Sequence, residues 1–140
     1  MPIPNGAGGY QLGDGNLNDP IIDLLPDPVI LTTATTLTSS QLLNGLIIVN
    51  NGIVASVNYT LPTVATLEAE LINSERPGTS FSFRVVNLGT TSGTAVIVTN
   101  TGWTISGSLT MTIPVTTGAS FIARKSAAGL PGPWTLYRVA

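Results

Sequence analysis

The segment at residues 16–31, NLNDPIIDLLPDPVIL, combines prolines with apolar residues in a way that excludes most regular structure. Proline lacks a backbone N–H and its ring clashes with the preceding helical turn, so Pro20, Pro26 and Pro28 exclude a continuous helix here. The missing donors also exclude a central strand of a sheet. The segment is nevertheless rich in Ile and Leu, which are unfavourable in water. We therefore predict that it is extended and gains its order on the surface of a partner.

Residues 1–31 as a whole are predicted to form an extended N-terminal arm, followed by a β-rich, trimerising body at 32–140. Gly and Asn, which favour turns, dominate the first half of the arm. A disordered tail is the alternative for the isolated molecule. Roughly 30 extended residues span at most about 100 Å, so the arm has a long reach. The residues predicted to bind the partner are Pro20, Ile21, Ile22, Asp23, Leu24, Leu25, Pro26, Asp27, Pro28, Val29 and Ile30.

Charge is sparse and unevenly placed. Only 9% of residues are charged and the net charge is −2, with every charged residue of the arm being an aspartate. The body carries all 5 bases of the chain, scattered along its length. Scattered bases do not form the phosphate-neutralising stripe that nucleic-acid binding needs, so no nucleic-acid partner is expected. A surface with so little charge is predicted to be partly buried against another chain.

The body is rich in Thr, Val and Ile, which favour strands. In SFSFRVVN at 80–87, Phe and Val alternate with polar residues, as in a strand with one buried face. The segment at 46–61 predicts two strands joined by a turn at Asn50–Gly52. A short helical turn capped by Ser39 or Ser40 is expected before Gly45. No internal repeat is clear, and turn-separated strands at short spacing indicate a sandwich or jelly roll.

The segment at 62–78, PTVATLEAELINSERPG, predicts the one clear helix. Thr63 is the expected N-cap, and Val64, Leu67 and Leu71 recur at helical spacing, facing the sheet. Pro77 and Gly78 then end the element. The predicted fold is therefore mainly β, an antiparallel sandwich or jelly-roll-like body with one short helix and an extended N-terminal arm.

The chain has no Cys and no His, which excludes disulfides, thiolate nucleophiles and Cys/His zinc sites. A Ser or Thr nucleophile would have only Lys125 as its base, and this lysine is expected on an exposed strand face. Glu68 and Glu70 are two apart on a helix and diverge, so they are expected to keep its outer face wet. We predict that the protein is not an enzyme and has no cofactor or metal site.

The arm also contains a partial match to a calcium-binding loop. Asp14, Asn16 and Asn18 match the first ligand positions of a calcium-binding loop, but Asp19 and Leu25 stand where glycine and glutamate are required. Weak binding of a divalent ion by the acidic arm is left open. No signal peptide and no membrane partner are expected, because no apolar run is long enough.

Aromatic residues offer one other candidate. Trp103, Trp134 and Tyr137 could form a platform on which a sugar ring stacks. Packing in the core or at a trimer interface is the favoured interpretation, because aromatic residues make up only 6% of the chain.

The body resembles the small capsid decoration, or cement, proteins of tailed bacteriophages over residues 36–140. The resemblance rests on the order of the segments LTSSQLLNGLI, YTLPTVATLEAEL, GTSFSFRVVNLGTTSGTAVIVTNTGWTISGS, TTGASFIARKS and WTLYRV. It implies a homotrimer on the outer surface of the capsid in the virion, bound to the major capsid protein where capsomers meet. Some proteins of this kind clamp neighbouring subunits with an extended terminal arm.

The resemblance and the arm together predict a structural virion protein that stabilises capsomer junctions. The alternative is a phage fibre, spike or receptor-binding module with the same β body. In that case the arm attaches the module to the virion, and loops at 87–94 or 126–133 contact host glycans.

Overall fold

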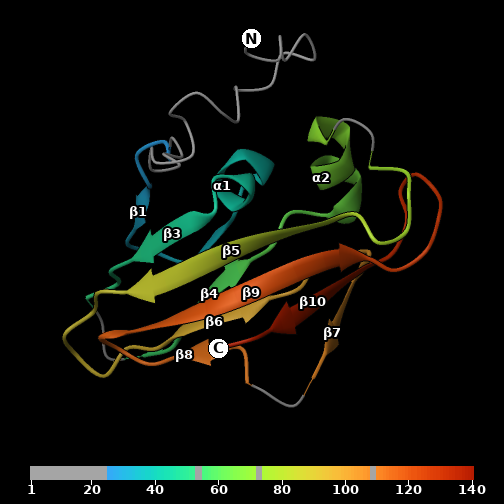
Figure 1. Cartoon of the computed structure of the whole chain (residues 1–140). Coiled ribbons are helices and arrows are strands. Elements are labelled where there is room, and N and C mark those ends of the chain that lie inside the picture. The colour runs from blue at the N-terminus through green and yellow to red at the C-terminus, as the bar shows by residue number, and fades with distance from the viewer. Residues whose placement is uncertain (1–24, 53–54, 72–73, 108–109) are drawn as a thin grey trace, which may run out of the picture.

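The computed structural model of the chain describes residues 25–52, 55–71, 74–107 and 110–140. These residues form a mainly-β body of two sheets with two helices at one end (Figure 1). The predicted mainly-β sandwich is thus confirmed. Where the sequence predicts one short helix, the described residues contain two.

Each sheet has a simple strand order. The six-stranded sheet runs β1 (Ile30–Leu31), β3 (Leu46–Val49), β5 (Ser80–Asn87), β9 (Thr117–Lys125), β10 (Trp134–Arg138) and β7 (Trp103–Ser106). The four-stranded sheet runs β2 (Thr35–Thr36), β4 (Val57–Thr60), β6 (Ala95–Val98) and β8 (Thr112–Ile113).

The chain passes repeatedly from one sheet to the other. β1, β3 and β5 pair in parallel in the six-stranded sheet, and β2, β4 and β6 pair in parallel in the four-stranded sheet. Each of these first three passes therefore adds one strand to each sheet, as in a short solenoid. The sequence shows no repeat because the passes differ in length: Ile30, Ile48 and Val86 share one row, yet the second interval is more than twice the first.

The C-terminal strands complete the body with antiparallel pairs. β9 pairs antiparallel with β5 and β10, and β8 with β6, while β10 and β7 are parallel. The sheets are therefore mixed, where the sequence analysis expects antiparallel pairing throughout. The reason is that β3 and β4, expected as neighbours joined by the Asn50–Gly52 turn, lie in different sheets. Parallel neighbours need a return connection, and α1 and α2 lie on two of these.

Both helices begin with a threonine cap. α1 (Ser39–Leu43) starts after Thr38, whose side chain accepts from the Gln41 N–H while the Gln41 side chain accepts from the Thr38 N–H. This capping box satisfies two donors at once, so the cap is Thr38 where Ser39 or Ser40 is expected. α2 (Val64–Glu70) starts after Thr63, as predicted, but ends at Glu70 because Leu71 adopts an extended conformation.

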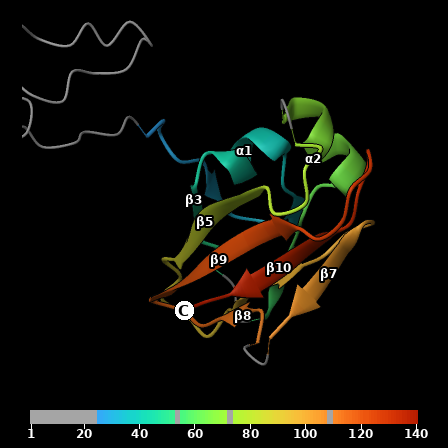
Figure 2. The ribbon, with the colours of Figure 1, turned by 45° about the vertical axis from the view of Figure 1, so that its right-hand side comes forward.

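The core lies between the two sheets and under the helices (Figure 2). Val64 and Leu67 of α2 are buried, and Leu71 packs against the cluster, as the helical spacing predicts. Phe83 and Phe121 stack with ring centroids 5.1 Å apart. Such contacts between neighbouring strands β5 and β9 add about 0.5–1.5 kcal/mol to the burial of the rings.

A close approach of backbone to helix fixes one glycine. Gly102 has a φ of +91°, and a Cβ there would lie 2.7 Å from the Val64 Cβ on α2. Gly107 also has a positive φ, +105°, but a Cβ there would meet nothing within 4 Å. The two glycines thus share the backbone requirement and differ in the space around them.

We predict that Gly102→Ala lowers the free energy of unfolding by about 1–3 kcal/mol more than Gly107→Ala, because only the first forces a collision in a packed region. Urea denaturation of both variants measures the difference. Equal losses for the two variants would contradict the packing of the Gly102 segment against α2.

Candidate functional site

The arm residues predicted to bind a partner fall partly outside the described part of the chain. Positions 20–24 (Pro20, Ile21, Ile22, Asp23 and Leu24) lie outside it. From 25 onward the chain is largely exposed: Leu25 is 55%, Val29 50% and Ile30 57% exposed, and Pro26 and Asp27 are also exposed. Pro28 is half-buried.

The end of the predicted arm enters the body as an edge strand. In β1, Ile30 pairs with Ile48 and Leu31 with Val49 of β3, and the Asn50 N–H donates to the Leu31 carbonyl at 2.8 Å. Proline is compatible with the approach to an edge strand, where donors on one side face solvent. The arm therefore leaves the body from the edge of the six-stranded sheet.

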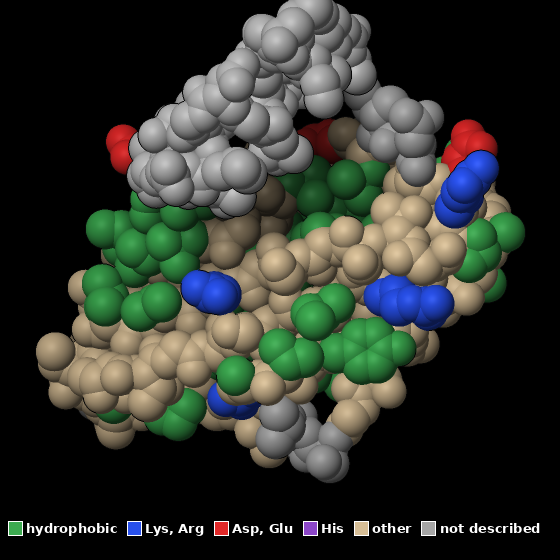
Figure 3. Space-filling model, in the orientation of Figure 1, with side chains coloured by type: hydrophobic (Ala, Val, Ile, Leu, Met, Phe, Trp, Pro, Cys, Tyr) green, Lys and Arg blue, Asp and Glu red, His purple; other side chains and the backbone are tan. Residues whose placement is uncertain are grey.

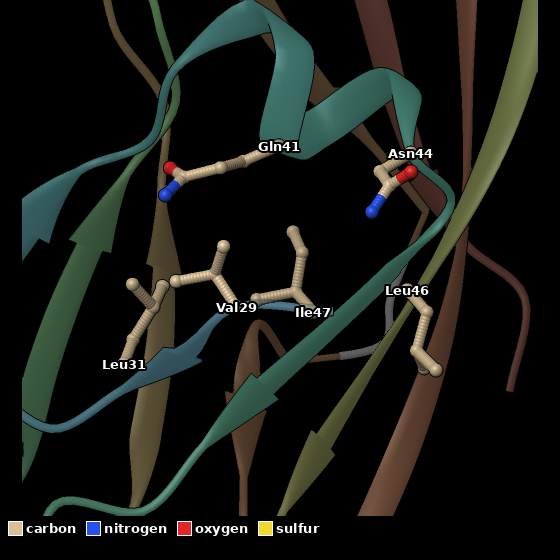
Figure 4. Close-up of a pocket in the computed structure, with 6 residues that line it drawn as sticks. All are labelled: Val29, Leu31, Gln41, Asn44, Leu46 and Ile47. Atoms are coloured by element: carbon tan, nitrogen blue, oxygen red, sulfur yellow. The ribbon is translucent and has the colours of Figure 1, made fainter. Parts of the chain in front are cut away.

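Beside this edge lies a small cavity between β1, α1 and β3. Figure 4 shows its lining, which consists of Gln41 on α1, Asn44 at the C-cap of α1, and the apolar residues Val29, Leu31, Leu46 and Ile47. Its volume of about 10 Å³ is the space of a single water molecule. It is too small for a ligand.

A larger, open groove of about 370 Å³ lies between the start of α2 and the loop at 131–133. Its lining consists of Thr, Val, Ala, Gly and Pro residues, among them Thr63, Thr101 and Pro131. None of these side chains carries a charge or an aromatic ring. The groove can therefore offer a ligand only hydroxyl groups and apolar contact.

Lys125 and Glu68 form a buried ion pair that corrects two sequence-based expectations. The Lys125 side chain is fully buried, not on an exposed strand face, and its Nζ contacts the Glu68 Oε1. The Glu68 side chain is 4% exposed and so does not lie on the wet face of α2. A charge removed from water in this way is tolerated because it is paired and hydrogen-bonded.

Further hydrogen bonds complete the pair. The Trp134 Nε1 donates to the Glu68 Oε1 at 2.8 Å, the Gly132 N–H donates to its Oε2 at 3.2 Å, and the Lys125 Nζ donates to the Gly129 carbonyl at 2.6 Å. The network ties α2 to β9, to β10 and to the loop between these strands. Gly132 is required at its position, since a Cβ there would lie 2.7 Å from the Lys125 Cε.

The environment of Glu68 has opposing effects on its pKa. Burial raises the pKa of this carboxyl, but the hydrogen bonds from Lys125, Trp134 and Gly132 and the charge of Lys125 lower it, and the net pKa lies below the ordinary 4.5. The carboxylate therefore stays charged and engaged at neutral pH. Lys125, held by Glu68 and Gly129, is not presented to a substrate as a base.

Both residues carried a signal that sequence reasoning missed. Glu68 lies four residues after Val64 on the apolar face of α2. Lys125 continues the alternation of Ala119, Phe121 and Ala123 along β9, all of which are buried. Position within the pattern, rather than residue type, predicts burial here.

The aromatic residues do not form a common platform. Trp103 and Trp134 are buried and pack against each other with ring centroids 6.1 Å apart, and the Trp103 Nε1 donates to the Pro62 carbonyl at 2.8 Å. Tyr137 is half-buried, and the alternation along β10 places it on the opposite side of the sheet from Trp134 and Leu136. The favoured interpretation of the two tryptophans as core residues is confirmed.

The outer face of the six-stranded sheet is a further candidate for a binding surface. Alternation along β5 and β9 buries Phe83, Val85 and Phe121 and turns Arg84, Ile122 and Arg124 outward, where all three are exposed. Figure 3 shows this face, with hydrophobic side chains lying between separate basic groups. We call it the outer face below, and further residues on it are Leu46, Ile48, Val86 and Tyr137.

Metal sites, membrane-spanning helices and similarity to known proteins provide no further candidate site in the part of the chain that the structure describes. Within the described ranges, no group of acidic side chains is placed to hold a metal ion, and no helix is long and apolar enough to cross a membrane. No family model, curated protein or solved structure matches the chain.

We predict that Lys125→Met lowers the free energy of unfolding by about 3–5 kcal/mol, because it leaves the Glu68 carboxylate buried without its counter-ion. The double variant with Glu68→Gln removes both charges and is expected to be markedly more stable than Lys125→Met alone. Thermal and urea denaturation of the variants measure this. As a control, Arg124→Met removes an exposed charge from the same strand and should change stability by at most about 0.5 kcal/mol.

Proposed function

We propose that this chain is a non-enzymatic structural protein of a virion, a capsid decoration or cement protein. It binds the outside of a phage head as a homotrimer, with the major capsid protein as its partner. The observation that carries the proposal is the outer face, an exposed sheet surface of apolar and basic residues, with a long acidic and apolar arm leaving from its edge.

The proposed mechanism depends on linking several weak contacts. Each arm contributes Ile21, Ile22, Leu24 and Leu25 to a contact beyond its own body, either on the shell or on a neighbouring decoration subunit. Three linked copies act at high effective concentration, so the assembly holds far more tightly than one arm. Because the trimer binds only the assembled lattice, its binding stabilises that lattice by mass action.

The buried ion pair supports a structural rather than catalytic role for Lys125. General-base activation of a nucleophile requires a base within hydrogen-bond reach of it. The Nζ of Lys125 is instead enclosed by Glu68 and the Gly129 carbonyl. In this position the pair fixes the loop at 126–133 to α2.

The second candidate function is a fibre, spike or receptor-binding module that recognises glycans. The open groove beside the loop at 131–133 favours it, because threonine hydroxyls line that groove. Its lining lacks the aromatic ring and the charged groups that sugar sites commonly use, so the cement function is preferred.

We predict that the full-length protein binds emptied, expanded phage heads saturably and raises their melting temperature. Cosedimentation measures the binding, and scanning calorimetry of bare and decorated heads measures the stabilisation. A glycan array with the same protein is the matched test of the rival. Reproducible sugar binding without head binding would overturn the cement proposal.

We predict that replacing Ile21, Ile22, Leu24 and Leu25 together with Ser weakens attachment to heads at least about tenfold, since each buried apolar side chain contributes about 1.5–3 kcal/mol. The melting temperature of the isolated body is expected to stay unchanged. A serine replacement at Leu12 is the control, because this residue lies in the arm but outside the segment at 16–31. Unchanged affinity of the fourfold variant would exclude the arm as the anchor.

A further inference from the structure

The outer face carries a short pattern of charged and apolar side chains. Arg84 of β5 pairs with Ser120 of β9. Ile122 and Arg124 follow Ser120 along β9. All three project outward at successive steps of the period-two alternation. The face thus presents Arg84, Ile122 and Arg124 in a slanted row, with steps of about 7 Å along the strands and Arg84 one strand to the side of the other two.

The two arginines have no acidic neighbours on their own sheet. No strand of the six-stranded sheet contains Asp or Glu. Within the described part of the chain, the one ion pair is that of Lys125 with Glu68, on the other side of the sheet. Arg84 and Arg124 are both exposed, so the face carries a net positive charge available to a partner.

The N-terminal arm contains the complementary pattern at the same spacing. Asp19, Ile21 and Asp23 alternate with Pro20 and Ile22. In an extended chain, residues at i, i+2 and i+4 project to the same side, at the same step as the residues of a strand. An Asp–Ile–Asp row therefore fits over the Arg–Ile–Arg row, with each aspartate at an arginine and the two isoleucines in contact.

The geometry of the chain before β1 directs the arm away from its own sheet. Pro26 and Pro28 fix their own backbone angles and hold Leu25 and Asp27 in extended conformations. In Figure 2 the described part of this segment leads away from the two sheets. To bind its own outer face, the arm would have to turn back after leading away from the sheets, whereas a second copy can receive it without such a reversal.

We propose that the outer face of one copy binds residues 19–23 of a second copy, with Asp19 and Asp23 at Arg84 and Arg124 and Ile21 on Ile122. The contact is heterologous, since the arm of each copy binds the face of the next, and three such contacts close a ring. This inference rests on the homotrimer of the proposed function, but not on its attachment to a phage head. It names the neighbouring copy as the partner of the arm.

Sedimentation velocity of the full-length chain tests the proposal by charge reversal. The wild type is expected to sediment as a trimer. Asp19→Arg with Asp23→Arg, and separately Arg84→Asp with Arg124→Asp, should raise the dissociation constant at least about tenfold, since two attractive charge pairs become repulsive. The chain with all four changes should regain the trimer, because each pair is restored with its signs exchanged.

Two controls separate recognition from net charge and from misfolding. Asp14→Arg with Asp27→Arg changes the charge of the arm equally but leaves the Asp–Ile–Asp row intact, so its trimer should persist. Arg84→Gln with Arg124→Gln removes the attraction without adding repulsion, and should weaken association while leaving the melting temperature of the body unchanged. It also serves as the second variant should the reversed face fail to fold.

Three results would each overturn the inference. They are a monomeric wild type, a trimer that persists with Arg84→Asp and Arg124→Asp, and a failure of the variant with all four charge changes to regain the trimer. A monomeric wild type would also contradict the homotrimer of the proposed function, but two other outcomes separate the two proposals. If the variant with Arg84→Asp and Arg124→Asp stays trimeric and still binds heads, only this contact is contradicted. Wild-type trimers that ignore heads would contradict the cement function alone.

Discussion

The pairing of strand β5 on both sides holds the body together, because β5 joins the parallel N-terminal strands to the antiparallel C-terminal strands. On one side it pairs in parallel with β3 and ends the stack of repeated passes, and on the other it pairs antiparallel with β9 over eight residues. Its inner side chains, Phe83 and Val85, lie in the core, and Arg84 forms part of the outer face. One strand thus joins the packing of the body to its candidate binding surface.

Local chemistry predicted much of this fold, and long-range pairing did not follow from it. The alternation in SFSFRVVN places Phe83 inside and Arg84 outside, and Thr63 before an apolar helical stripe predicts the start of α2. The direction of pairing could not be predicted, since alternation along a strand contains no information about its neighbour. The Asn50–Gly52 turn therefore suggested a hairpin, whereas the chain there crosses to the other sheet.

The candidate sites show the same division. The extended arm stays a prediction, made because its prolines exclude other structures, and the structure adds that Ile30 and Leu31 join β3. The burial of Lys125 and Glu68 was missed because residue type was weighed above periodicity. The outer face could not be found from sequence alone, since Arg84 and Arg124 are 40 positions apart and come to lie on the same face only through the register of β5 with β9.

The solenoid-like passes begin with strands of only two residues, β1 and β2, at corresponding edges of the two sheets. A long bare edge would recruit further chains through its free backbone groups, and assembly would then continue without limit. Here the edge is short, and the nearby Pro26 and Pro28 have no N–H to donate. Edge-to-edge addition of further chains at β1 and β2 is thereby disfavoured.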